Sequence, residues 1–203
     1  MSRSIIQSFF FTSVSLFFAS VVHAQETLAE ESFSVHPVLT AGYTSGGDTL
    51  VQVEFDDGDR EKLKAGGAFL FGFGAEFVSS DKQLAVRLTA NYHFDSIDAE
   101  NGETSFERYP IELMFFDQGE RNRFGAGFTV HLSPTAQLKV DGQRRESINF
   151  DTALGLVFEY NYLIGNAMWL GVRYTFIDYE TQNNINSVSV DGNHVGLMAH
   201  FIF

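Results

Sequence analysis

The chain closes with Val195-Gly196-Leu197-Met198-Ala199-His200-Phe201-Ile202-Phe203, and the two alternating sets of side chains in it differ in kind. One set is apolar or aromatic throughout: Val195, Leu197, Ala199, Phe201 and Phe203. The other set contains Gly196, Met198 and His200. Successive side chains of a β-strand point to opposite faces. One continuous apolar face and one mixed face are typical of a strand in a membrane-spanning barrel, with lipid on the apolar side.

The same alternation recurs along the chain and predicts an all-β fold, an eight-stranded antiparallel transmembrane β-barrel. The expected strands cover residues 33–44, 66–78, 84–95, 106–116, 123–133, 150–162 and 168–179, and an eighth ends at Phe203. Segment 84–95 shows the pattern most clearly, because apolar residues from Val86 to Phe94 alternate with polar ones from Arg87 to Asp95. The mean hydropathy is near zero, so the membrane assignment depends on alternation.

The connections between the expected strands alternate in length. The short ones cover residues 79–83, 118–122 and 163–167, and the long, polar ones cover 45–65, 96–105, 134–147 and 181–190. Outer-membrane barrels keep short turns on the periplasmic side and longer loops outside, so we expect both termini in the periplasm. Residues 49–64 contain a strand-like run and the turn pair Asp57-Gly58. They predict either a ninth strand or a hairpin beyond the bilayer, and the even strand number of bacterial barrels favours the hairpin.

The amino-terminal residues predict a secretory signal peptide. Arg3 precedes an apolar run from Ile5 to Val22, and Val22-His23-Ala24 has the small residues of a cleavage site. We expect residues 1–24 to be removed and residues 25–203 to form the barrel in the outer membrane of a Gram-negative bacterium. An uncleaved anchor helix is disfavoured, because a span needs about 20 mostly apolar residues and this run is diluted by serine.

Composition excludes other classes of protein. The formal net charge is −13, whereas binding to nucleic acid requires clustered Lys and Arg. The chain contains 0 cysteines, so it has no disulfide framework, no thiol chemistry and no attachment residue of a lipoprotein.

Charged residues occupy the inward phase of the expected strands. The predicted lumen charge network consists of Glu76, Arg87, Arg108, Glu112, Glu159 and Arg173. Glu76 and Arg87 fall opposite each other across the turn around Asp81, and a direct pair would offset the cost of burying each ion. The network is either a structural lattice that fills the barrel, which we favour, or a gate that rearranges to open a water path.

Several glycines share this inward phase and either leave room for large side chains or relieve sheet curvature. They are Gly72, Gly74, Gly125, Gly127, Gly155, Gly171 and Gly196.

The signal segment, the alternating segments, Trp169-Leu170-Gly171-Val172-Arg173-Tyr174 and the closing stretch 195–203 together resemble the small outer-membrane β-barrels of the OmpA, OmpX and OmpW type. The resemblance covers essentially the whole mature chain and implies a fold and a location more than an activity. It also implies that the closing strand is a signal for the outer-membrane assembly machinery. We expect no peptidoglycan-binding domain after Phe203, in contrast to two-domain OmpA proteins.

One short motif invites a catalytic interpretation. His131-Leu132-Ser133 is similar to the His-x-Ser pair of the outer-membrane lipid A deacylases. Catalysis also requires a carboxylate that orients the histidine, and spacing ties neither Glu146 nor Asp151 to the pair. Pro134 departs from the polar continuation of the deacylase pattern. We therefore expect no catalytic residues, with lipid A deacylation as the weaker alternative.

No cofactor or metal site is predicted. His36 and His200 could be neighbours where the first and last strands meet, but no third ligand has a defined spacing. Asp56-Asp57-Gly58-Asp59 could hold a divalent cation that bridges lipopolysaccharide phosphates, but it lacks the spacing of a calcium loop, and we favour a turn at a solvated tip. Asn101-Gly102 likewise predicts a turn.

Three functions of different classes follow. The favoured one is a non-catalytic, monomeric barrel with a structural or surface-interaction role, whose loops contact lipopolysaccharide, other cells or host surfaces. The second is a narrow channel for ions or small apolar molecules, and the third is a lipid-modifying enzyme. The expected partners are outer-membrane lipids, lipopolysaccharide and the assembly machinery.

Overall fold

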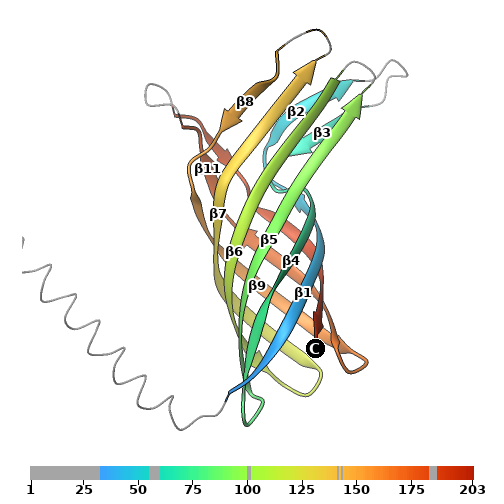
Figure 1. Ribbon diagram of the computed structural model, residues 1–203, viewed down its shortest axis with the longest axis vertical. Coiled ribbons are helices and arrows are strands. Elements are labelled where there is room, and N and C mark those ends of the chain that lie inside the picture. Colours follow the sequence, from blue (N-terminus) through green and yellow to red (C-terminus); the bar gives the residue numbers. More distant parts are fainter. Residues whose placement is uncertain (1–32, 55–59, 100–101, 141, 143, 183–186) are drawn as a thin grey trace, which may run out of the picture.

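The computed structural model describes residues 33–54, 60–99, 102–140, 142, 144–182 and 187–203 and shows a closed antiparallel barrel (Figure 1). The wall consists of β1 (Phe33–Gly46), β4 (Ala68–Ser79), β5 (Leu84–Ala99), β6 (Gly102–Gln118), β7 (Asn122–Val140), β9 (Ala153–Ile164), β10 (Met168–Phe176) and β13 (His194–Ile202). Each wall strand pairs with the next one along the chain, and β13 pairs with β1 to close the seam. Among the described residues, no helix is long and apolar enough to cross a membrane. The predicted eight-stranded barrel is confirmed.

The two faces of the wall have opposite chemistry, as the alternation predicted. Outward-facing Phe73, Leu154 and Leu197 are 67%, 68% and 66% exposed, whereas inward-facing Arg87 and Glu159 are 1% and 4% exposed. An apolar surface of this extent would be unstable in water and is stable against lipid tails. The period of two therefore defines the membrane-facing side along every wall strand.

The connections at one end of the barrel are tight turns, and the carboxyl terminus lies at this end (Figure 1). Residues 80–83, 119–121 and 165–167 link successive strands here, which confirms the predicted short connections. Asp81 shapes the first turn by accepting hydrogen bonds from the Ser79 hydroxyl at 2.5 Å and the Gln83 backbone amide at 3.0 Å. Both bonds favour the ionised carboxylate, so the pKa of Asp81 lies below its ordinary value of 3.8.

The connections at the opposite end are longer, as predicted, but most of their residues are paired in strands. β5 and β6 remain paired as far as Ala99 and Gly102, and β7 continues to pair with β8 (Glu146–Asn149). β11 (Asp178–Glu180) pairs with β12 (Ser189–Asp191). The expected strand over 150–162 begins only at Ala153. Polar side chains made these segments resemble loops, while pairing satisfies their backbone hydrogen-bonding groups above the membrane.

Residues 49–64 form the predicted hairpin and add no ninth strand to the barrel wall. β2 (Thr49–Glu54) and β3 (Arg60–Lys64) make a separate two-stranded sheet, while Asp56, Asp57, Gly58 and Asp59 lie outside the described residues. The hairpin covers the end of the barrel, because its side chains enter an apolar cluster that we call the apolar plug. The plug consists of Leu63, Ala65, Ile97, Phe106, Ala136, Phe150, Ala153, Ile177 and Tyr179.

A β-bulge reverses the side-chain phase of β7. Leu132 pairs with Tyr109 and Thr135 pairs with Glu107, so Ser133 and Pro134 together lie opposite Arg108. Ser133 has a φ of 46°, a left-handed conformation that costs a non-glycine residue free energy. Before the bulge His131 faces the lumen, and after it Pro134 and Ala136 do. The alternation predicted up to Ser133 therefore does not continue beyond it.

Candidate functional site

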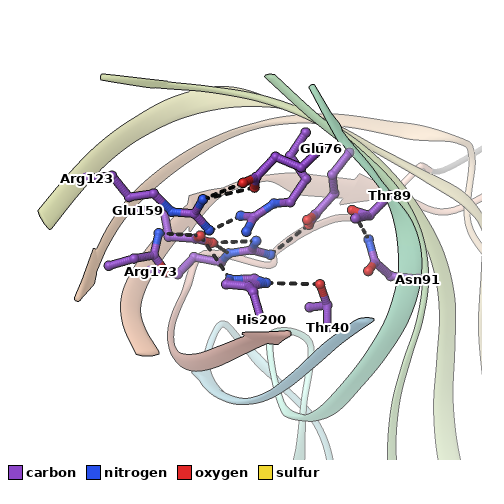
Figure 2. A network of polar contacts seen from close by, with 11 residues as sticks. Thr40, Glu76, Thr89, Asn91, Arg123, Glu159, Arg173 and His200 are labelled. Carbon is purple, nitrogen blue, oxygen red and sulfur yellow. Dashed lines mark hydrogen bonds and ion pairs between the residues drawn. The ribbon is translucent and has the colours of Figure 1, made fainter. Parts of the chain in front are cut away.

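Glu159 on β9 is the centre of a network of polar contacts that fills the lumen (Figure 2). One of its carboxylate oxygens, Oε1, contacts Arg87 Nη2 at 2.6 Å, Asn161 Nδ2 at 2.9 Å and His200 Nε2 at 3.0 Å. The other, Oε2, accepts a hydrogen bond from Arg173 Nε at 2.7 Å. The Glu159 side chain is 0% exposed, so every contact operates in a poorly solvated interior, where ionic hydrogen bonds are strong.

The network continues to both sides of Glu159. Arg173 Nη1 donates to Glu112 Oε1 at 2.8 Å, which links β10 to β6. His200 Nδ1 lies 3.0 Å from the Thr40 hydroxyl across the β1–β13 seam. The two ring nitrogens of His200 thus have different neighbours, because Nε2 faces the Glu159 carboxylate and Nδ1 bonds with the Thr40 hydroxyl. Side chains from distant parts of the barrel wall are thus joined across the lumen.

The ion pair predicted between Glu76 and Arg87 is not formed. These residues are Cα partners in the β4–β5 register, as expected, but Glu76 accepts two hydrogen bonds from Arg123 Nη1, both at 2.9 Å. Arg87 pairs with Glu159 instead. The lumen is narrow enough for a long arginine side chain to reach across it, so register does not determine the partner.

Arg123 is a lumen residue that the sequence analysis missed, although its place beside outward-facing Phe124 gives it the inward phase. Its guanidinium lies between the rings of Phe116, at 4.5 Å, and Trp169, at 4.2 Å. Arg87 lies over the Phe116 ring at 4.6 Å. Cation–π contacts of this kind stabilise a desolvated guanidinium by up to about 2 kcal/mol. These contacts stabilise the flat faces of the Arg87 and Arg123 guanidinium groups, which hydrogen bonds in the guanidinium plane do not reach.

Arg108 faces the lumen as predicted but does not join the carboxylate network. Its Nη1 and Nη2 donate to the backbone carbonyls of Ala65 and Gly67, just after β3. Its side chain is fully buried, and no salt bridge to it occurs among the described residues. The lumen charges therefore comprise five of the six predicted residues together with Arg123. The sixth, Arg108, holds the base of the hairpin.

The inward glycines provide room for side chains. A Cβ at Gly171 would overlap Asn161 Oδ1, and one at Gly125 would overlap the Phe116 ring. A Cβ at Gly72 would likewise overlap Asn91 Oδ1. Of the two explanations open at the sequence level, side-chain packing accounts directly for these three positions.

His131 and Ser133 are separated by the bulge and do not form a catalytic pair. His131 is 2% exposed, and its Nδ1 lies 2.8 Å from the Tyr179 hydroxyl inside the lumen. Ser133 is exposed, and its carbonyl accepts a hydrogen bond from Thr135 at 3.2 Å. Glu146 and Asp151 are both exposed and do not orient the histidine. The arrangement lacks the nucleophile–base contact that acyl transfer requires.

His36 and His200 are not brought together at the seam. His36 Nδ1 lies 3.1 Å from the Phe203 carbonyl, whereas His200 is four residues further along the seam, opposite Thr40. Among the described residues, no group of three or more His, Cys, Asp or Glu side chains is arranged so that it could hold a metal ion. Asn101 and the acidic tip of the hairpin lie outside the described residues, so the turns expected there remain predictions.

A cavity of about 890 Å³ opens at the turn end of the barrel. We call it the turn-side vestibule. Its mouth is lined by the turns at Asp81 and Glu120, and its inner limit is formed by Glu76 and Trp169. Because Glu76 and Trp169 are 1% and 6% exposed, the vestibule ends at the Glu76–Arg123 pair.

A closed eight-stranded barrel, apolar outside and charged within, is the architecture of a small outer-membrane protein. The family model described as "Outer membrane protein beta-barrel domain" matches residues 12–203, and the chain belongs to this family. Its location is therefore the outer membrane of a Gram-negative bacterium. The end with the tight turns is periplasmic, and the opposite end, where the longer connections form paired strands that we call the extracellular ribbons, faces outside the cell. No curated protein sequence matches the chain.

Two solved structures illustrate the likeness. Ail, the attachment invasion locus protein of Yersinia pestis, in complex with the heparin analogue sucrose octasulfate, aligns with a TM-score of 0.54 and 12% identity, over 85% of this chain and 99% of the Ail chain. Neisserial surface protein A aligns with a TM-score of 0.47 and 13% identity, over 85% of this chain and 100% of the other. At 12% identity the likeness to Ail shows the fold alone.

Proposed function

We propose that this chain is a non-catalytic, monomeric outer-membrane barrel with a structural or surface-interaction role. The observation that carries the proposal is the buried ion-pair network, which occupies the middle of the lumen. Arg87, Glu159, Arg173 and Glu112 extend across it from β5, β9, β10 and β6. The part exposed to the cell's surroundings is then the set of extracellular ribbons and the β2–β3 hairpin.

The channel alternative requires these pairs to separate. Removing one partner of a buried ion pair costs about 3–5 kcal/mol, and a path would break several contacts to Glu159 together. The turn-side vestibule reaches only Glu76, and the apolar plug covers the other end. Both features favour a filled barrel over a channel that is open at rest.

The outward side chains just above the membrane favour contact with lipopolysaccharide. Tyr92 and Tyr109 lie with ring centroids 5.4 Å apart and ring planes tilted by 33°, and girdles of aromatic residues flank the apolar band of outer-membrane barrels. Beyond them, Glu103, Lys139 and Arg145 line a polar depression on the ribbon of β6 and β7. Polar and charged groups at this height would meet the headgroups rather than the lipid tails. The sulfated ligand of Ail is a polyanion and matches a chain of net charge −13 poorly.

The closing strand is proposed to be recognised by the assembly machinery. Its outward side chains form one apolar row on β13 and at the terminus, which consists of Val195, Leu197, Ala199, Phe201 and Phe203. Phe203 is 67% exposed and so available to another protein before insertion.

Signal-peptide cleavage after Ala24 is likewise proposed, and mass spectrometry of the mature protein should find Gln25 at its amino terminus.

Recording from the refolded mature chain in planar bilayers tests this function. We expect no discrete conductance steps, and mass spectrometry of lipopolysaccharide incubated with the protein should show no loss of acyl chains. Steps that grow with Arg87→Ala would instead favour a gated channel. Acyl-chain removal that depends on Ser133 would establish an enzyme.

A further inference from the structure

A layer of three histidines lies in the lumen directly beneath the apolar plug. His93, His131 and His194 come from β5, β7 and β13, and they are 0%, 2% and 3% exposed. The ring centroid of His93 lies 5.5 Å from that of His194 and 6.4 Å from that of His131. We call these residues the histidine layer. The ion-pair network does not use them, and nothing in the proposed function requires three imidazoles here.

Each imidazole of the layer is bonded to a neutral group. His93 Nε2 lies 2.9 Å from the Thr44 hydroxyl, and His194 Nδ1 lies 2.7 Å from the Gly192 carbonyl. The His131 contact is the Tyr179 hydroxyl. His200 provides the contrast inside the same barrel, because it lies 3.0 Å from the Glu159 carboxylate. A proton added to His200 would gain a counter-ion, whereas one added to the histidine layer would not.

The charged groups around the layer are cationic. Arg108 from β6 and Arg173 from β10 act electrostatically on all three imidazoles. The nearby carboxylates of the described residues are already engaged: Glu112 and Glu159 bind Arg173, and Asp95 on β5 accepts from the Lys64 amide of β3 at 3.4 Å. Tyr179 is the titratable group contributed by β11, and β1 contributes only the Thr44 hydroxyl. A proton on any of the three imidazoles would be a like charge to these arginines, and such repulsion is strong in a dry interior.

The same partners hold the plug in place. Thr44, which contacts His93, also donates to the Gly66 carbonyl at 2.6 Å, and Gly66 follows the hairpin directly. Tyr179, which contacts His131, belongs to the plug itself. Arg108 donates to carbonyls on either side of Gly66. Any shift of the imidazoles away from Arg108 therefore acts on the base of the hairpin and on the plug.

We propose that the histidine layer is an acid-sensitive latch, in which proton uptake by the imidazoles repels Arg108, releases the β2–β3 hairpin and exposes the apolar plug at the extracellular end. The barrel below remains closed, because Arg173 is held by the carboxylates of Glu112 and Glu159, whereas Arg108 is held by backbone carbonyls. This latch gives the barrel a conformational response to external acid.

The natural absence of cysteine permits a direct test on the refolded mature chain. Leu63→Cys places one thiol in the plug, where Leu63 is 0% exposed, and Val188→Cys places one on the exposed extracellular surface, where Val188 is 57% exposed. Both react with 4,4′-dithiodipyridine, a reagent that works in acid. We expect the Leu63→Cys rate, divided by the Val188→Cys rate, to rise about tenfold or more between about pH 7.5 and about pH 4.5. Fluorescence of Trp169, the one tryptophan, should stay unchanged.

Histidine variants identify the source of the response. His93→Gln with His194→Asn keeps an amide nitrogen near each lost ring nitrogen and should remove most of the rise. His131→Asn alone should reduce it, which covers the case in which the double variant does not fold. His36→Gln, at the turn end, should leave it intact. A rate ratio that does not change with pH overturns the proposal, as does an undiminished rise in the variants. A change of Trp169 fluorescence in parallel would indicate general unfolding and overturn it too.

Discussion

Replacing Glu159 by glutamine tests the central claim that the lumen network stabilises the barrel. The substitution keeps the shape of the side chain and removes its charge. Arg87 then loses its ion-pair partner, while Arg173 keeps Glu112 at 2.8 Å. His200 loses its contact with a carboxylate, although its hydrogen bond with Thr40 remains.

The size of the effect follows from these contacts. Removing one partner of a buried ion pair destabilises a protein by about 3–5 kcal/mol, because the other charge stays buried without compensation. Only Arg87 is left in that state, so the free energy of unfolding should fall by about 3–5 kcal/mol. Glu103→Gln, on the exposed side of the β6 extension, is the matched control and should change it by less than about 0.5 kcal/mol.

Equilibrium unfolding in denaturant, followed by Trp169 fluorescence, measures the difference. Trp169 contacts the Arg123 guanidinium at 4.2 Å and so reports on the lumen. The double variant Arg87→Met with Glu159→Met should recover much of the loss, since a buried pair can often be exchanged for apolar residues at little cost. If Glu159→Gln proved as stable as Glu103→Gln, the network would not be what holds the barrel together.

Three further outcomes are expected. Gly74→Ala should prevent refolding, since a Cβ there overlaps the Leu88 carbonyl, whereas Gly119→Ala should refold normally. Heat-modified mobility in gels distinguishes folded from unfolded barrels. A folded Gly74→Ala barrel would contradict the packing. Ser133→Gly should raise the free energy of unfolding by about 1 kcal/mol, because glycine removes the cost of a φ of 46°, and Ser133→Val should lower it; equal stabilities would argue against the bulge. Asp81, whose pKa lies below 3.8 when folded, should contribute stability that is present above pH 3.8 and lost as pH falls through the folded pKa. NMR titration of its carboxyl would show the depressed value, and Ser79→Ala should move it back toward 3.8.

The barrel itself could be derived from the sequence, because side chains of a strand alternate with a period of two and those that face lipid must be apolar. That is a local rule, and each strand obeys it independently of its neighbours. Short turns then carry the register across, which is why Glu76 and Arg87 are correctly predicted as Cα partners. The inward phase of Glu159 and Arg173 follows in the same way.

Partners across the lumen could not be derived from the sequence. Arg123 reaches Glu76, and Arg87 reaches Glu159, between strands that are not adjacent in the wall. Which of several inward arginines meets which glutamate depends on strand tilt, on the closed circumference and on aromatic rings such as Phe116. These are properties of the closed barrel, and no local pattern contains them.

The extracellular half shows the same division. A polar run from Ser96 to Ser105 is compatible with a loop or with a strand above the membrane, because lipid no longer imposes alternation there. The sequence alone therefore determined the membrane-spanning wall, its orientation and its charged interior. Only the tertiary structure decided how the hairpin covers the barrel, where the bulge at Ser133 reverses the phase, and how Arg108 and three histidines meet, since each depends on contacts between residues far apart in the chain.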